Sequence, residues 1–567
     1  MALKSIPDLL FADPLPRLDL DRLRRVVSFV YAAGDSGGAL AEALCRVRPI
    51  ESSFEPGCFA RDVFLDDLAS SLFAVTLEGR EFGVALEYAL NVVATPPRAE
   101  EDVAYRRGIL DELMARPALV ERAGESYAAI ARLKQHLEDS DPSNPVESVR
   151  RRLDLLEDVR GVLLGLAAFS ECKSGLGRIA EWAAGQRARP EFARLTELLD
   201  FETNLSLMDL RVRVGADGRL RGFDIVKLEE NVRNRFYLTP LKRWLNRIHM
   251  WFRGYRFGEH ELLSRLVDSA FSAFEPQVAA LLQLGLDLGM YVGQLQFRAR
   301  AQRVKLDMRC ADLVSGGEGS RLERLFNPLL LAHGVEPIPC DIEFGGNCSV
   351  LVVTGPNSGG KTRLMQSLAF AQLLGEGGWL VPAAHARLER AGGLFASLIE
   401  EPAADQREGR LGSELLRIRR VFEHARPGAL VLLDELCSGT NPSEGEQLFE
   451  LVVELLFELR PRAFVTTHFL ELAQRLEREL KPDHPGDLGF LQVELDEHMV
   501  PTFGFVPGVA STSLARETAS RLGVTRDELL GLIRRHPALP SPSEPPVVDS
   551  QANVEAPDSA FDSVRQS

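Results

Sequence analysis

Apolar residues recur at helical spacing through the first two hundred residues of the chain. The i, i+3, i+4 pattern is clear in segments such as 65–74 (LDDLASSLFA) and 149–158 (VRRRLDLLED). This spacing predicts a mostly α-helical region from about 16 to 200. Helical periodicity returns from about 258 to 310, where it predicts an arm that leads back toward the rest of the chain. Without a sustained heptad repeat, the pattern does not favour a coiled coil.

Between these helical parts the pattern changes to an alternation of polar and apolar residues. Residues 209–214 (DLRVRV) and 219–227 (RLRGFDIVK) alternate with a period of two, and Gly-Ala-Asp-Gly separates them at 215–218. Alternation on both sides of an Asp-Gly turn predicts a β-hairpin near 209–228.

Three short apolar runs in the second half of the chain predict buried strands of an α/β domain. They are 349–353 (SVLVV), 429–433 (ALVLL) and 463–467 (AFVTT). Each run is followed by polar residues that could bind a ligand or take part in catalysis. They lie at the carboxyl end of the strand, where α/β sheets bind their ligands.

The first run leads into TGPNSGGKTR at 354–363 and then into a helix-like segment. This fits G-x-x-x-x-G-K-[ST], in which backbone N–H groups and a helix N-terminus surround phosphate oxygens, the lysine reaches the β- and γ-phosphates, and the hydroxyl holds Mg²⁺. The alternative, a glycine-rich turn with a chance lysine, does not account for the strand and helix on either side. We therefore expect ATP to contact Gly355, Pro356, Asn357, Ser358, Gly359, Gly360, Lys361 and Thr362.

Two carboxylates follow the second apolar run, and a histidine follows the third. Asp434 would hold Mg²⁺ with Thr362, and Glu435 would polarise the water that attacks the γ-phosphate. Alone, Asp-Glu would fit a solvated strand end equally well, but about seventy residues after the glycine loop it indicates a nucleotide-hydrolysing site. His468 would contact the γ-phosphate or the water, or would be an ordinary hydrogen-bonded histidine at a strand end. The predicted catalytic residues are Glu435, His468 and Lys361.

In this order the motifs resemble the ATPase domain of the MutS DNA mismatch-repair proteins, a branch of the ABC-type ATPases. The resemblance rests on TGPNSGGKT (354–362), LVLLDELCSGTNPSEG (430–445) and VTTHFLELA (465–473). The flanking segments FNPLL (326–330) and FVPG (505–508) agree with it. It covers about 320 to 535 and is much weaker upstream.

The resemblance implies a composite ATP site between two facing ATPase domains of a homodimer. Segment 438–445 would lie at the dimer contact, and a serine at a helix start would reach the partner's nucleotide. The chain departs from the family here: Gly409 falls at the position of that serine, so Ser413 or Arg410 would have to make the contact. Ser358 stands where the family usually has Met or Ala, and Thr362 where it usually has Ser followed by Thr.

DNA is the partner that the resemblance implies, and segment 231–256 is locally basic with interleaved aromatics. Such a composition suits phosphate contacts and stacking. Two alternatives are a helix with core aromatics and solvated arginines, and a membrane-surface helix. Because a Phe-x-Glu wedge for mispaired bases is missing near the N-terminus, we expect backbone- or structure-dependent binding with little mismatch preference. The candidate contacts are Arg233, Arg235, Lys242, Arg243, Arg247, Arg253 and Arg256.

Composition and charge narrow the remaining possibilities. The net charge of −16 argues against a uniformly basic surface that coats nucleic acid, although a local basic track stays compatible with it. Seven cysteines without C-x-x-C spacing indicate scattered thiols in a reducing compartment. The start lacks a signal-peptide pattern, and uninterrupted apolar runs stay shorter than the eighteen or so residues of a membrane span, so we expect a cytoplasmic protein that does not enter membranes.

These observations predict a fold of the class α plus α/β. A helical core and lever region at 1–320 would precede an ABC-type P-loop ATPase domain at 321–535, and a Pro- and Ser-rich acidic tail at 536–567 would be disordered. The expected function is a MutS-like, ATP-dependent DNA-binding ATPase of mismatch repair or recombination, dimeric and dependent on ATP and Mg²⁺. An ATP-switched scaffold or regulator of partner proteins is the alternative. A transporter ATPase is disfavoured because the L-S-G-G-Q signature is missing.

Overall fold

The computed structural model describes most of the chain in two compact units, Met1–Ser513 and Leu514–Ser567. The described residues are 7–35, 37–83, 85–139, 145–203, 206–214, 220–230, 259–346, 349–398, 409–437, 441–479, 488–511 and 523–535. The second unit contributes one described helix, α19 (Arg526–Arg535). Everything below concerns the first unit. The predicted boundaries at 320 and 535 stay predictions, as does the character of the tail, which lies outside the described residues.

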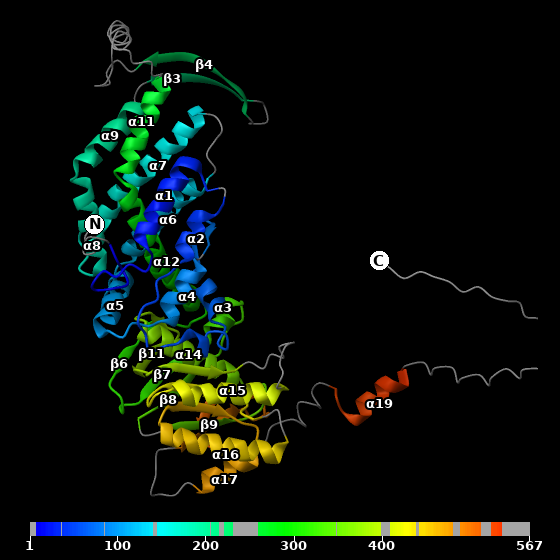
Figure 1. Ribbon diagram of the computed structural model, residues 1–567. Helices are drawn as coiled ribbons and strands as arrows, with labels where there is room; N and C mark the ends of the chain where they lie inside the picture. Colours follow the sequence, from blue (N-terminus) through cyan, green and yellow to red (C-terminus); the bar gives the residue numbers. More distant parts are fainter. Residues whose placement is uncertain are drawn as a thin grey trace, which may run out of the picture. The chain divides into compact units, whose positions relative to one another are not determined.

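The N-terminal part of the first unit is helical, which confirms the interpretation of the 3.6-residue spacing (Figure 1). A short hairpin accompanies the helices, with strands β1 (Val75–Leu77) and β2 (Arg80–Phe82), and so do two 3-10 turns at Pro56–Cys58 and Leu166–Phe169. The helices are α1 (Leu20–Ala33), α2 (Ala39–Cys45), α3 (Leu65–Leu72), α4 (Leu86–Ala94), α5 (Glu100–Ala115), α6 (Pro117–Glu138), α7 (Pro145–Gly165), α8 (Gly175–Arg187), α9 (Pro190–Thr203), α11 (Glu259–Ser272) and α12 (Glu275–Arg303).

Helix α12 is the central helix of this region and packs against α1 and α6. Small residues allow the close approach: a Cβ at Gly285 would lie 2.6 Å from Ile130, and one at Gly289 would lie 2.9 Å from Tyr127, both on α6. By length and composition α12 is the one helix among the described residues that could cross a membrane, but 94% of its most apolar window is buried inside the protein. Its apolar surface is therefore covered by its own neighbours.

Strands β3 (Ser206–Val214) and β4 (Leu220–Glu230) pair antiparallel where the alternating pattern predicted a hairpin. The register runs from Ser206 opposite Glu230 to Val214 opposite Leu220. The Asp-Gly turn lies outside the described residues, and so do the seven predicted DNA contacts between Arg233 and Arg256.

The second part of the unit is an α/β domain built on a six-stranded sheet with the order β12-β13-β14-β9-β15-β16. All neighbours are parallel except the edge pair β15 and β16. Figure 1 shows α14 above β9, and α16 and α17 below it. The sheet consists of β9 (Val350–Thr354), β12 (Leu394–Ser397), β13 (Leu430–Leu433), β14 (Arg462–Thr466), β15 (Leu488–Leu495) and β16 (Pro501–Pro507), and the helices are α13 (Pro328–Ala332), α14 (Lys361–Glu376), α15 (Gly409–His424), α16 (Pro442–Leu459) and α17 (Leu470–Glu479).

The three apolar runs form neighbouring strands of this sheet, and every residue of β9, β13 and β14 is buried. A smaller sheet with the order β6-β11-β7-β8, and the pair β5 and β10, complete the domain. Its strands are β5 (Arg309–Cys310), β6 (Asp312–Val314), β7 (Ser320–Leu325), β8 (Cys340–Phe344), β10 (Leu380–Val381) and β11 (His385–Glu389). The predicted fold class, a helical region followed by an α/β domain, is confirmed.

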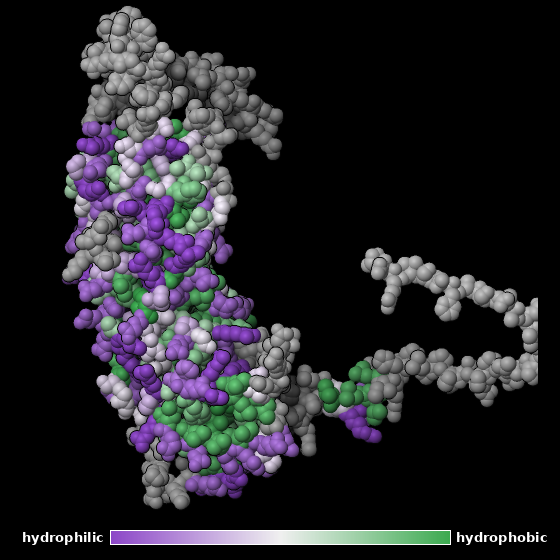
Figure 2. Space-filling view, in the orientation of Figure 1, coloured by the Kyte–Doolittle hydropathy of each residue, from purple (hydrophilic) through white to green (hydrophobic). Residues whose placement is uncertain are grey.

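An apolar patch lies on the outer side of the α/β domain. Figure 2 shows apolar side chains gathered over α15 and α16. Leu416 of α15 and Leu451 of α16 are each 49% exposed, and Leu455 of α16 is 42% exposed. Exposed apolar groups of this kind commonly contact other molecules.

The helical region and the α/β domain meet at the C-terminal end of α14, and we call these contacts the seam. Arg106 of α5 is fully buried and donates one hydrogen bond to the Leu10 carbonyl at 2.8 Å and another to the Gly377 carbonyl at 2.9 Å. Gln294 of α12 accepts from the Leu380 N–H at 3.1 Å and donates to the Leu380 carbonyl at 3.4 Å. Because the last carbonyls of a helix have no partner inside it, the Arg106 contact supplies one from the other region.

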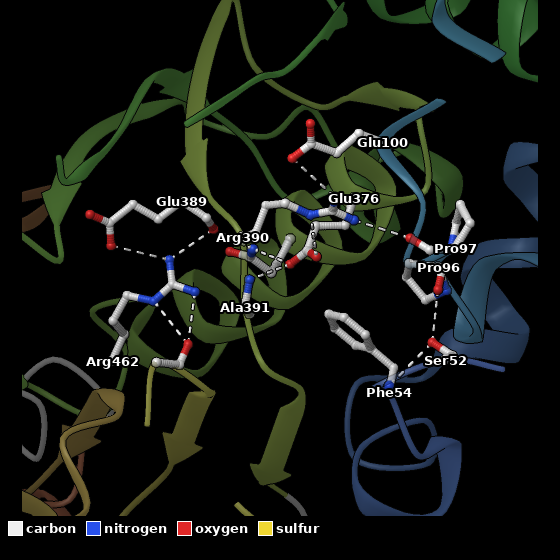
Figure 3. Close-up of polar contacts among 12 residues, drawn as sticks. Ser52, Phe54, Pro96, Pro97, Glu100, Glu376, Glu389, Arg390, Ala391 and Arg462 are labelled. Atoms are coloured by element: carbon white, nitrogen blue, oxygen red, sulfur yellow. Dashed lines mark hydrogen bonds and ion pairs between the residues drawn. The ribbon is translucent and has the colours of Figure 1, made fainter. Parts of the chain in front are cut away.

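A second set of seam contacts surrounds Arg390, which follows β11 (Figure 3). Its guanidinium donates to the Pro97 carbonyl at 3.1 Å and lies 3.7 Å from Glu100, both at the start of α5. Its Nε lies 3.6 Å from the buried carboxylate of Glu376, the last residue of α14. Burial raises the pKa of Glu376, while hydrogen bonds from the Ala391 N–H and nearby positive charge oppose that rise. Arg390 therefore connects the end of α14 with the helical region.

Candidate ATP site

The glycine loop leaves the buried strand β9 and turns sharply into α14. Gly355 has φ +134° and Gly360 has φ +86°, a region of conformational space that side chains rarely adopt. A Cβ at Gly355 would also lie 2.7 Å from Val493 of β15, and one at Gly359 would lie 2.8 Å from the same side chain. Both backbone shape and close packing thus require glycine in this loop.

Lys361 is the first residue of α14, and its ammonium group lies against the loop. The side chain is 4% exposed, and its Nζ donates to the Gly355 carbonyl at 2.8 Å and to the Pro356 carbonyl at 3.1 Å. Burial lowers the pKa of Lys361, and the negative charges of Glu435 and Asp434 oppose that effect. A buried cation at a helix N-terminus is a group that a phosphate anion would stabilise.

The carboxylates after β13 lie beside the loop, as the order of the parallel strands requires. Thr362 donates its hydroxyl hydrogen to one oxygen of Asp434, and Thr466 donates to the other at 2.6 Å. The Glu435 N–H donates to the Thr466 hydroxyl at 2.6 Å. Strands β13 and β14 pair with Leu433 opposite Val465, which places the next residues, Asp434 and Thr466, side by side.

The Thr362 hydroxyl and the Asp434 carboxylate are oxygen ligands of the types that magnesium prefers. Mg²⁺ is usually held by one or two carboxylates, a hydroxyl and substrate phosphates. Thr362 and Asp434 supply that donor pair at the start of α14, next to the buried ammonium of Lys361. The predicted metal ligands therefore lie together, and the predicted base, Glu435, follows Asp434 directly.

The other predicted site residues differ in solvent exposure. Pro356 and Gly359 are buried, whereas Asn357 and Ser358 are exposed at the loop surface. His468 is exposed beyond the end of β14, and its ring centroid lies 4.3 Å from that of Phe469. Its predicted contact with the γ-phosphate or the attacking water stays a prediction.

The helix predicted to reach a partner's nucleotide begins at the expected place. Gly409 is the first residue of α15, and Ser413 lies one turn along the helix. The contact of this segment with a partner's nucleotide stays a prediction. Residues 438–440 of the predicted dimer contact lie outside the described residues.

A pocket of about 490 Å³ lies beside the glycine loop, and part of its wall is apolar. Val335 and Ile338 line one part of it, and Phe503 and Phe505 of β16 line another. Asn327 also lines it and donates to the Arg363 carbonyl at 3.1 Å, which ties this segment to α14. Aromatic and aliphatic walls beside a phosphate loop suit the flat base of a nucleotide.

The predicted site residues did not include Thr466 or the lining residues Asn327, Val335, Ile338, Phe503 and Phe505. A signal for the pocket existed, because the segments 326–330 and 505–508 agree with the MutS pattern and both supply lining residues. For Thr466 the only signal was its place at the end of a strand-like run, one position before another threonine.

Comparison with known proteins agrees with the geometry. Residues 351–514 match the family described as MutS domain V. The Endonuclease MutS2 of Thermomicrobium roseum is 34% identical over 219 residues, which are 37% of this chain and 27% of that protein. The Endonuclease MutS2 of Symbiobacterium thermophilum is 29% identical over 276 residues, or 47% of this chain and 32% of that protein. The matched segments thus span about a third or less of these relatives.

Proposed function

Because this chain is a MutS-family protein whose residues 351–514 form the domain V ATPase, we propose that it binds and hydrolyses ATP to control an association with DNA. One observation carries the proposal. The ammonium of Lys361, the hydroxyl of Thr362 and the carboxylate of Asp434 meet at the carboxyl ends of β9 and β13. A nucleoside triphosphate with its metal needs this set of groups.

Each residue would have a separate task in hydrolysis. Lys361 would bind the β- and γ-phosphates, with backbone N–H groups of Asn357 to Gly360 around them. Thr362 and Asp434 would hold Mg²⁺, which neutralises phosphate charge when bound. Glu435 would accept a proton from the attacking water, and His468 would orient that water or the γ-phosphate. The pocket walls at Ile338, Phe503 and Phe505 would receive the base.

The DNA and dimer parts of the proposal rest on the family, and the location rests on the scattered cysteines of the sequence. The relatives are named as endonucleases, but only about a third or less of each one matches, so our proposal stops at ATP-dependent DNA binding. We propose a cytoplasmic homodimer joined through the ATPase domains, with α15 beginning near the partner's nucleotide. DNA would be contacted through its backbone by the basic segment 231–256.

The ATPase proposal is tested by Glu435→Gln, which keeps the shape of the side chain and removes the base. Hydrolysis should fall by about 100-fold or more, while ATP binding is retained and a dimer accumulates in ATP. Glu454→Gln on α16 changes an exposed glutamate and should hydrolyse ATP at the wild-type rate. Full hydrolysis by the Glu435 variant would reject its role, and monomers in ATP for both proteins would reject the composite site.

The DNA proposal is tested by measuring hydrolysis and binding with duplex, mismatched and branched DNA over a range of salt concentrations. Affinity should fall steeply with salt, and Lys242→Ala with Arg243→Ala should make the slope shallower by up to about two units. If none of the DNAs binds and none changes the rate of ATP hydrolysis, the alternative of an ATP-switched scaffold is favoured instead. Strong selectivity for one mismatch would contradict the expected backbone recognition.

A further inference from the structure

Thr466, the last residue of β14, bonds to three consecutive residues of the neighbouring strand end. Its side chain is fully buried. The hydroxyl donates to Asp434 at 2.6 Å and accepts from the Glu435 N–H at 2.6 Å, and the carbonyl accepts from the Leu436 N–H at 3.3 Å. The hydroxyl has one hydrogen to donate, and here it is directed to a carboxylate.

The residues that Thr466 contacts have an unusual backbone. Glu435 has φ +48° and Cys437 has φ +60°, although neither is glycine. A non-glycine residue in this left-handed region is held there by its surroundings at a cost of roughly 1 to 2 kcal/mol. Thr466 holds one end of the turn, and the buried carboxylate of Glu414 holds the other by accepting from the Cys437 N–H at 2.6 Å.

The next residue along the strand, Thr467, provides a natural contrast. Its side chain is just as buried, with 1% exposed. Its hydroxyl accepts from the Phe469 N–H at 3.0 Å, two residues further along the chain. Two adjacent buried threonines therefore differ in that only the hydroxyl of Thr466 contacts the candidate carboxylates.

We propose that Thr466 is a positioning residue for ATP hydrolysis, an inference that rests on the proposed function. Its hydroxyl contacts both an oxygen of Asp434 and the backbone N–H of Glu435. The metal-binding carboxylate and the base are thereby held in fixed positions relative to the glycine loop. Thr362 contacts the other oxygen of Asp434 and is itself a predicted metal ligand. Thr466 is fully buried and is not a predicted metal ligand, so its proposed role is to hold Asp434 and Glu435 in place.

The test compares Thr466→Val with Thr466→Ser and uses Thr467→Val as the matched control. Binding of a fluorescent ATP analogue is measured in EDTA and in magnesium, and kcat and the melting temperature are measured in parallel. Thr466→Val should bind the analogue in EDTA within about twofold of wild type, should lose about tenfold of the affinity that magnesium adds, and should lose about tenfold in kcat. Thr466→Ser should recover both, and Thr467→Val should resemble wild type.

Two outcomes would overturn the inference while leaving the ATPase proposal intact. One is wild-type kcat and wild-type magnesium dependence in Thr466→Val, and the other is an equal loss in Thr467→Val, which would indicate a general effect of altering buried threonines. Thr466→Ala, which removes the same hydroxyl without adding a methyl group, is measured alongside in case the valine variant fails to fold. A wild-type protein that neither binds nor hydrolyses ATP would instead reject the proposed function itself.

Discussion

The two ends of α14 differ in what they contact. At its N-terminal end, Lys361 and Thr362 face the glycine loop and a pocket of about 490 Å³. At its C-terminal end, Glu376 and Gly377 are bonded to Arg390 and Arg106 in the seam. Polar groups at the first end are arranged for a ligand, whereas those at the second already have partners within the protein.

One helix thus serves ligand binding at one end and stability at the other. Substitutions at the loop end should change nucleotide affinity and leave the fold intact. Substitutions in the seam should change the free energy of unfolding, because they leave buried groups without partners.

The largest effect is expected for Arg106→Met, which keeps an apolar stem and removes the hydrogen bonds to Leu10 and Gly377. Two buried carbonyls lose their donor, so the free energy of unfolding should fall by about 3 kcal/mol. Arg107→Met is the control, since Arg107 is 30% exposed and pairs with Asp312; it should cost less than about 1 kcal/mol. Thermal and urea unfolding measure both. Both arginines link α5 to the α/β domain, so an equal loss in the two variants would contradict a special role for the buried bonds of Arg106.

An intermediate effect is expected for Lys361→Ala at the loop end. Removing a buried cation from the phosphate site should weaken ATP binding by about 2 kcal/mol or more, roughly 30-fold in Kd. The melting temperature should fall less than in Arg106→Met. The Gly355 and Pro356 carbonyls lose their donor here as well, but removing Lys361 also removes the cost of burying its charge, the cost that lowers its pKa. Titration calorimetry tests this, with Lys134→Ala as the control; Lys134 is a half-exposed residue of α6 that pairs with Glu138, away from the loop. Unchanged ATP affinity would reject the phosphate-loop role.

The smallest effect is expected for Arg390→Gln, which removes the cation beside Glu376. Glu376 keeps its bond from the Ala391 N–H, so stability near neutral pH should fall by only about 1 kcal/mol. Burial raises the pKa of Glu376, so this carboxyl favours the folded state at low pH and less so as pH rises through its folded pKa. Losing Arg390 raises that pKa further, and the deficit relative to wild type should grow with pH. A deficit that shrinks with rising pH would contradict this.

Sequence alone predicted the parts of the site that depend on local pattern. The glycine loop and Asp434 with Glu435 each follow a continuous apolar run, and such runs form buried parallel strands whose carboxyl ends meet. The helical region was also predictable, because its spacing is regular over long stretches. These features need only a few consecutive residues to be recognised.

The missed features depend on contacts between distant residues. Arg106 contacts Gly377, 271 positions away, and the sequence around neither residue marks the pair. Thr466 lies beside Asp434 only because β13 and β14 are neighbours in a particular register. Phe503 reaches the pocket because β16 returns antiparallel along β15. Strand order and register are properties of the whole sheet, which short motifs do not specify.

The burial of α14 from Leu364 to its end at Glu376 has a consequence for hydrogen exchange. Every residue from Leu364 to Glu376 is buried, so the backbone amides of this stretch cannot reach solvent through local opening of an exposed helix face. Such amides exchange only through unfolding of the surrounding cooperative unit. Since the seam joins α14 to α5 and α12, bound nucleotide should slow exchange in those distant helices by mass action alone, without moving any of them. Protection spreading through the helical region would then report on ligand affinity.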